Sequence, residues 1–101
     1  MLSWHKQLVK TLQEKLGFSN YAIACNSGTS GLHAALYAAG VKPGDEVILP
    51  AFTIISCLSA ILRTGATPIF CDVHEKSWNM TLEDVESKFS KNTKAVLCLL
   101  Y

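Results

Sequence analysis

Short, continuously apolar runs alternate along this chain with stretches whose apolar residues recur at helical spacing. The apolar runs cover residues 21–25, 46–49, 68–71 and 95–100, and each is too short to be a helix. Strands that are apolar throughout, rather than at every second position, are typical of a parallel sheet that is covered on both faces. The pattern therefore predicts an α/β fold, a mostly parallel sheet with helices on both faces.

Four stretches outside these runs are expected to be helical. Their apolar residues recur every three or four positions within residues 4–16, 32–39, 54–62 and 82–89. Glycine commonly ends a helix, and the first three stretches are each followed by one, at Gly17, Gly40 and Gly65. Thr81, with Asp84 three residues later, resembles a capping box and should open the fourth helix.

Composition limits the partners that this chain can have. Its 101 residues allow one domain, half of them are hydrophobic, and only 17% are charged, so we expect further protein surface to cover part of it. The net charge of +1 and dispersed basic residues predict no nucleic-acid or acidic-membrane partner. The longest apolar stretch, residues 51–62, is shorter than the roughly 20 residues that span a bilayer. Without a secretory signal at its start, the chain is expected to be cytoplasmic.

The four cysteines lie inside apolar runs and show no paired spacing of the kind that metal and redox sites use. We expect them to be buried free thiols, as is usual for such residues: Cys25, Cys57, Cys71 and Cys98. A metal site at Cys71, Asp72 and His74 is the alternative, but no spacing rule supports it and further ligands would be needed.

The loops that follow the strands are the candidate ligand-binding segments, because open α/β sheets bind ligands outside the carboxyl ends of their strands. Residues 26–30, 50–53 and 72–77 qualify. The first has a strand, a glycine turn and a helix start rich in Ser and Thr, which together suit a phosphate. The alternative is that Ser27 or Thr29 only caps the helix. Neither the Gly-x-Gly-x-x-Gly nor the Gly-Lys-Ser/Thr motif occurs, which disfavours a dinucleotide or ATP site.

Four segments in order carry a family resemblance: NSGTSGLH (26–33), PGDEVILPAFT (43–53), GATPIFCDV (65–73) and NTKAV (92–96). They resemble successive blocks of the DegT/DnrJ/StrS family of sugar aminotransferases, which depend on pyridoxal 5'-phosphate (PLP), and within that family its perosamine-synthase-like members. The resemblance covers about residues 4–101. It implies part of the large domain of a fold-type I PLP-dependent transferase, a three-layer α/β/α structure. Residues 1–101 would be an N-terminal fragment, truncated at the C-terminus and also at the N-terminus.

The resemblance also implies cofactor-binding residues. Gly28 would let the PLP phosphate approach the backbone, and Thr29 and Ser30 would donate N–H and hydroxyl groups to it. Ile54 stands where the family usually places an aromatic ring on the PLP ring, so that stacking contribution would be lost. Three nearby residues are expected to have other roles: Phe52 in the core, Asp72 in a loop or cap, and His33 in helix packing or at the surface.

The function implied is amino transfer, usually from glutamate, to a keto-sugar nucleotide by a homodimer, as in polysaccharide biosynthesis. In the family the lysine that holds PLP as a Schiff base lies further along the sequence than Tyr101, and no lysine here can be assigned that role. We therefore expect no catalytic residue in this chain, and no activity from the fragment alone. Two alternatives stay open: a stand-alone phosphate-binding or PLP-binding module, and a non-catalytic remnant that pairs with a related subunit.

Overall fold

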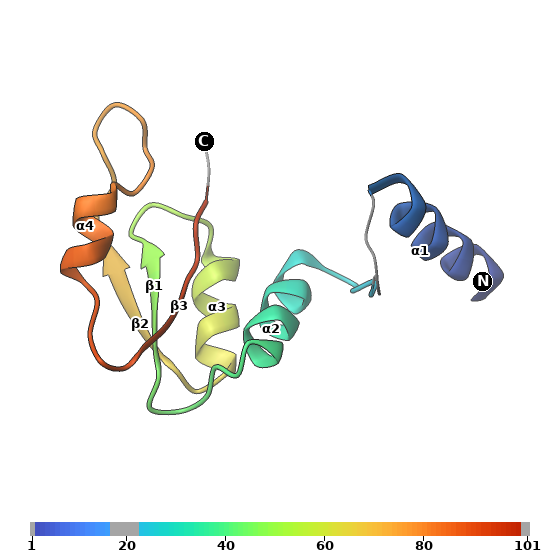
Figure 1. The fold of residues 1–101 in the computed structure, drawn as a ribbon, viewed down its shortest axis with the longest axis horizontal. Coiled ribbons are helices and arrows are strands. Elements are labelled where there is room, and N and C mark those ends of the chain that lie inside the picture. Colours follow the sequence, from blue (N-terminus) through green and yellow to red (C-terminus); the bar gives the residue numbers. More distant parts are fainter. Residues whose placement is uncertain (1, 17–22, 100–101) are drawn as a thin grey trace.

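The computed structural model describes residues 2–16 and 23–99, and from residue 28 onward helices and strands alternate along the chain (Figure 1). The helix α1 (Leu2–Leu16) precedes the gap and is described by itself. The second range contains three helices and three strands: α2 (Gly28–Ala38), β1 (Glu46–Pro50), α3 (Ile55–Arg63), β2 (Thr67–Cys71), α4 (Leu82–Ser87) and β3 (Thr93–Val96). None of the helices in the described ranges is long and apolar enough to cross a bilayer.

The three strands form one parallel sheet in the order β2-β1-β3. The central strand β1 pairs Glu46 with Thr67 of β2 and with Thr93 of β3. A register shift between Glu46 and Val47 then places Val47 opposite Ala95. The predicted parallel α/β fold is confirmed.

Helices lie on both sides of this sheet. On one face α2 and α3 pack against Val47 and Leu49, and the fully buried Ile61 of α3 is central to that core. On the other side lies α4, separated from α3 by β1 and β2 in Figure 1. The core on the α2 and α3 face consists of Leu36, Val41, Val47, Leu49, Ala60, Ile61 and Ala66.

Two predicted strands differ from the structure. Residues 23–25 are not a strand, and residues 21–22 lie outside the described ranges. A strand exists only where a neighbour takes up its backbone hydrogen bonds, and the described sheet is formed by β1, β2 and β3 alone. The last strand was expected over residues 95–100, but β3 begins at Thr93 and ends at Val96. One further backbone bond, from the N–H of Leu97 to the carbonyl of Ile48, continues the pairing.

The predicted helix boundaries are largely confirmed. Gly40 and Gly65 follow α2 and α3 with φ of 85° and 81°, the left-handed conformation in which glycine ends helices; Gly17 lies outside the described residues. The Thr81 hydroxyl oxygen accepts the N–H of Asp84 at 3.3 Å, which caps α4 as expected. The Thr81 hydroxyl also donates to the Asp84 carboxylate at 2.9 Å. In a capping box that carboxylate would accept the backbone N–H of Thr81, whereas here it accepts the side-chain hydroxyl.

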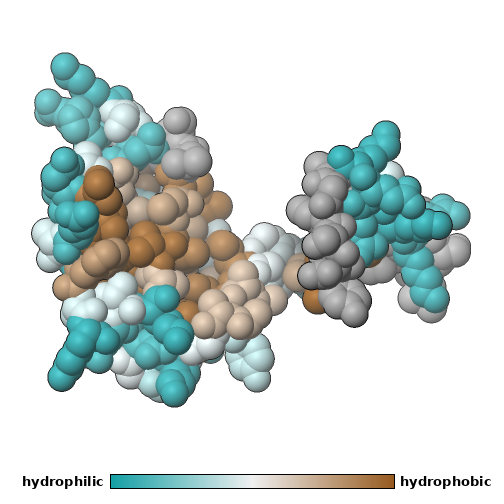
Figure 2. Space-filling model, viewed as in Figure 1, coloured by the Kyte–Doolittle hydropathy of each residue, from teal (hydrophilic) through white to brown (hydrophobic). Residues whose placement is uncertain are grey.

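Apolar side chains remain exposed on this small domain. Figure 2 shows hydrophobic residues gathered over the middle of the part that carries the sheet, with hydrophilic residues around them. The four cysteines are free thiols, but the expectation that all are buried was wrong: Cys71 is buried and Cys57 half-buried, whereas Cys25 and Cys98 are exposed. Cys25 and Cys98 lie in the parts of the predicted strands 21–25 and 95–100 that do not form strand in the structure.

Candidate functional site

The three candidate loops lie at one edge of the sheet. Because the strands are parallel, β1 and β2 end together, and we call this side the carboxyl edge. The helices α2 and α3 run back in the opposite direction, so their N-termini lie at the same edge (Figure 1). The structure therefore brings the start of α2, the loop 51–54 and the loop 72–80 to one side of the sheet.

The start of α2 is organised by Ser27. Its side-chain oxygen accepts the N–H of Ser30 at 3.2 Å, and its hydroxyl donates to the Ser30 Oγ at 3.1 Å. Its carbonyl accepts the N–H of Gly31 at 3.1 Å. The capping alternative for Ser27 is thus present in the structure. A phosphate could accept the N–H of Ser30 only if Ser27 released it. Gly28 and Thr29 lie in the first turn of α2, where N–H groups have no hydrogen-bond partner within the helix, so these two N–H groups are the ones suited to a phosphate.

Gly28 meets the geometric requirement for close approach by an anion. Its φ is not in the left-handed region, so the backbone there does not require glycine. A Cβ at this position would meet no atom within 4 Å, which leaves open space beside the helix N-terminus. Thr29 and Ser30 are half-buried beside that space. Backbone N–H groups, hydroxyls and the positive end of the helix dipole are together suited to a phosphate.

Ile54 lies at the start of α3, on the same edge. It is the N-cap residue but makes no side-chain capping bond, and its side chain is 58% exposed. The expectation that Phe52 belongs to the core was wrong, because its side chain is half-exposed and its ring lies 4.9 Å from that of Trp78. An apolar side chain in a loop that crosses the end of the sheet has no second layer to cover it.

The remaining candidates have structural roles. Asp72 is exposed in its loop, and its carboxylate accepts the N–H of Val73 at 2.9 Å, as expected for a loop residue. His74 Nδ1 accepts the N–H of Lys76 at 3.1 Å. Burial raises the pKa of the Cys71 thiol, and the charges of Asp84 and Asp72 raise it further, so this thiol stays protonated at neutral pH. In the described ranges no three metal-binding side chains gather.

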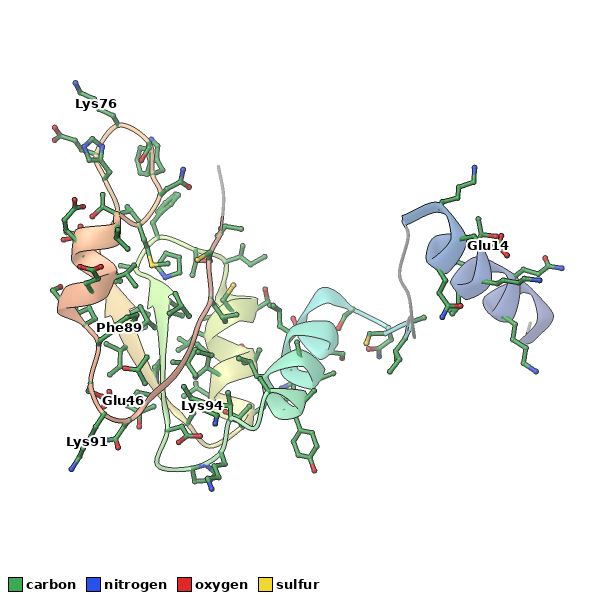
Figure 3. The ribbon with its side chains drawn as sticks, in the orientation of Figure 1. Glu14, Glu46, Lys76, Phe89, Lys91 and Lys94 are labelled. Carbon is green, nitrogen blue, oxygen red and sulfur yellow. The ribbon has the colours of Figure 1, made fainter. Side chains whose placement is uncertain are left out.

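The lysines of residues 23–99 are all exposed: Lys42, Lys76, Lys88, Lys91 and Lys94. Figure 3 shows Lys76 on the loop beyond the carboxyl edge, whereas Lys91 and Lys94 lie near Glu46 at the opposite end of the sheet. An open hollow of about 400 Å³ lies along β3 and the segment before it, and Phe89, Ser90 and Lys94 are among its lining residues. It is separate from the loops of the carboxyl edge.

Trp78 is a residue at this edge that sequence reasoning missed. It lies in a polar loop, and a large aromatic residue in such a loop could have indicated a specific contact from the sequence alone. Its φ of 62° is the one left-handed value at a non-glycine residue in the described ranges. Sequence patterns contain no indication of that conformation.

The sequence model of the DegT/DnrJ/EryC1/StrS aminotransferase family matches residues 4–100. The GDP-perosamine synthase of Escherichia coli O157:H7 is 47% identical over 79 residues, which cover 78% of this chain and 22% of that protein. The UDP-N-acetyl-3-dehydro-alpha-D-glucosamine 3-aminotransferase of Acidithiobacillus ferrooxidans is 43% identical over 86 residues, covering 83% of this chain and 23% of that protein. The chain thus spans about a fifth of the length of these relatives.

Solved structures agree with this match. NtdA from Bacillus subtilis, solved with bound cofactor PMP, superimposes with a TM-score of 0.85 at 33% identity over 92% of this chain and 21% of that one. An aminotransferase from Psychrobacter cryohalolentis gives a TM-score of 0.82 at 38% identity over 92% of this chain and 23% of that one. The described fold is therefore that of a segment of such proteins.

Proposed function

Because the chain belongs to the DegT/DnrJ/EryC1/StrS aminotransferase family, we propose that it is part of the large domain of a PLP-dependent sugar aminotransferase. The complete protein transfers an amino group, with glutamate as donor, to a keto-sugar nucleotide in the cytoplasm. Relatives named as a perosamine synthase and as an amino-sugar aminotransferase support this substrate class. The activity belongs to the complete protein, since this chain spans about a fifth of those relatives.

The observation that carries the proposal is the open helix start at Gly28 on the carboxyl edge. There the N–H groups of Gly28 and Thr29 bind the phosphate of PLP, and the hydroxyls of Thr29 and Ser30 complete the contact. The helix dipole of α2 adds attraction for the dianion. Bound PLP supplies the electron sink that amino transfer requires. Ser27 orders the turn in the absence of ligand through its bonds to Ser30.

Ile54 covers one face of the PLP ring in this proposal and keeps water from it. The exposed side chain of Ile54 supports this role, because it leaves an apolar group at the carboxyl edge that a bound ring would cover. An isoleucine excludes water but lacks the ring stacking that an aromatic side chain contributes, about 0.5 to 1.5 kcal/mol.

Ile54→Phe is therefore expected to tighten PLP binding by roughly two- to tenfold, the equivalent of that stacking energy. The measurement is an equilibrium titration of the cofactor-free complete protein with PLP, followed by cofactor absorbance. Leu82→Phe is the matched control, because Leu82 is an apolar residue that is 69% exposed and has no proposed contact with PLP or with a second subunit. Equal effects from both substitutions would show that the gain is not stacking at position 54.

We also propose that the complete protein is a homodimer and that α3 lies in the contact between its two subunits. Ile55 and Leu62 are seven residues apart on α3, 73% and 55% exposed. Exposed apolar side chains grouped on one helix mark a surface that is buried in an assembly. Light scattering of the complete protein gives the oligomeric state, and a monomer at micromolar concentration would contradict this part of the proposal.

The function is tested on the complete protein with PLP, glutamate and a panel of GDP-linked and UDP-linked keto sugars. The expected products are 2-oxoglutarate and an amino sugar nucleotide, identified by mass spectrometry. The 101-residue chain alone should give no product. PLP binding without amino transfer to any keto-sugar nucleotide would instead favour the binding module, and a complete protein that does not bind PLP would contradict the proposal.

A further inference from the structure

Two aromatic rings connect the two loops of the carboxyl edge. The rings of Phe52, in the loop after β1, and Trp78, in the loop after β2, lie 4.9 Å apart and are tilted by 48°. Both side chains are half-exposed. A tilted pair at this separation has favourable geometry and contributes beyond the area that it buries. The contact therefore ties one loop to the other at the end of the sheet.

The backbone of Trp78 is held in an uncommon conformation to make this contact. Its φ of 62° is unusual for a bulky residue and has an energetic cost. Two backbone bonds close the loop around it: the N–H of Trp78 donates to the carbonyl of His74 at 2.9 Å, and the N–H of His74 donates to the carbonyl of Asn79 at 2.9 Å. Strain of this kind persists where the surroundings fix the residue, and it is concentrated at functional sites.

The loop that receives this ring also carries Ile54. On the side of β1 it is fixed by the N–H of Ala51, which donates to the carbonyl of Cys71 at 2.8 Å. On the side of α3, the carbonyl of Ile54 accepts the N–H of Cys57 at 3.2 Å, and the Thr53 hydroxyl donates to the Cys57 Sγ at 3.4 Å. The ring of Phe52, two residues before Ile54, thus gives this loop a lateral contact on its exposed side.

We propose that Trp78 is a positioning residue: through the ring of Phe52 it fixes the loop 51–54 and so holds Ile54 in place over the cofactor ring. The inference rests on the proposed function, because it needs PLP at the carboxyl edge. It adds a residue from the loop after β2 that does not itself touch the cofactor. The left-handed backbone conformation of Trp78 has an energetic cost, and it directs the Trp78 ring toward Phe52.

Trp78→Ala in the complete protein should weaken PLP binding roughly two- to tenfold, the equivalent of one aromatic pair. Trp78→Phe keeps a ring and should restore most of the affinity. Trp78→Gly relaxes the backbone but lacks the ring, so it should bind PLP as weakly as Trp78→Ala. Phe89→Ala is the matched control, because Phe89 is an aromatic residue of similar exposure outside the carboxyl-edge loops, and it should leave the affinity unchanged.

The decisive comparison repeats Trp78→Ala in an Ile54→Ala background. If Trp78 acts through Ile54, adding Trp78→Ala to Ile54→Ala should not weaken PLP binding any further. The circular dichroism of bound PLP should then be the same in the Ile54→Ala variant and in the double variant. Equal weakening in both backgrounds, or full affinity in Trp78→Gly, would overturn the inference. Wild-type protein that fails to bind PLP would refute the proposed function itself, whereas tight wild-type binding with unchanged variants would refute only the role of Trp78.

Discussion

Gly28→Asp is expected to weaken PLP binding by at least roughly 100-fold, because it places a carboxylate beside the proposed phosphate site. Two unit charges about 5 Å apart at an effective dielectric constant of about 20 repel by roughly 3 kcal/mol, and the phosphate carries nearly two charges. The same carboxylate in the first turn of α2 interacts favourably with the helix dipole, by about 0.3 to 1 kcal/mol. The cofactor-free protein should therefore be unchanged or slightly more stable, as measured by its thermal midpoint.

Gly28→Asn is the matched control for this experiment. It has nearly the same size as aspartate but no charge, and the open space at position 28 accommodates either side chain. Its effect on PLP affinity should be much smaller than that of Gly28→Asp, and only the aspartate variant should improve as salt is added. Similar losses from both variants would indicate that bulk, and not charge, controls the site. Full affinity in the aspartate variant would place the phosphate elsewhere.

Gly65→Ala is expected to lower the free energy of unfolding by about 2 to 4 kcal/mol, from two causes. The φ of 81° at Gly65 is unfavourable for a residue with a side chain. In addition, a Cβ at this position would lie 2.6 Å from Pro43 Cγ, a distance that real contacts do not reach. The turn between α3 and β2 would have to shift, together with the buried Ala66 that follows it. Urea unfolding of the cofactor-free complete protein measures the change.

Gly44→Ala separates these two causes. Its φ is 96°, but a Cβ there would meet no atom within 4 Å, so only the backbone cost of about 1 to 2 kcal/mol is expected. Pro43→Ala combined with Gly65→Ala removes the clash and should recover part of the lost stability. If Gly65→Ala were no more destabilising than Gly44→Ala, the contact with Pro43 would not contribute.

The sheet was predictable because its signals are local. β1 and β2 are continuous apolar runs between turn residues, and each appears within one residue of its expected bounds. The segment of residues 23–25 has the same composition, but pairing depends on a neighbour that no local pattern specifies. Likewise, the apolar character of Phe52 suggested burial, whereas its place in a loop at the end of the sheet leaves it half-exposed.

The candidate site was predictable in outline and not in detail. The start of α2 with Gly28 and Thr29 lies at the carboxyl edge as expected, but this follows from the direction of α2, because no strand precedes the turn at residues 23–25. The engagement of the Ser30 N–H by Ser27 depends on a side-chain conformation that no pattern records. The pairing of Trp78 with Phe52 joins two loops through a left-handed residue, and such a conformation is disfavoured by default for tryptophan.

The order of strands in the sheet has a consequence for how the protein is made. The first of the three strands to be synthesised, β1, is the central one, and Glu46 pairs with both Thr67 and Thr93. While the chain emerges from the ribosome, β1 therefore has two unsatisfied edges until β2 appears, and one until β3 follows. Contacts so distant in sequence slow folding, so the nascent chain should expose the apolar strand β1 until its two neighbours have been made.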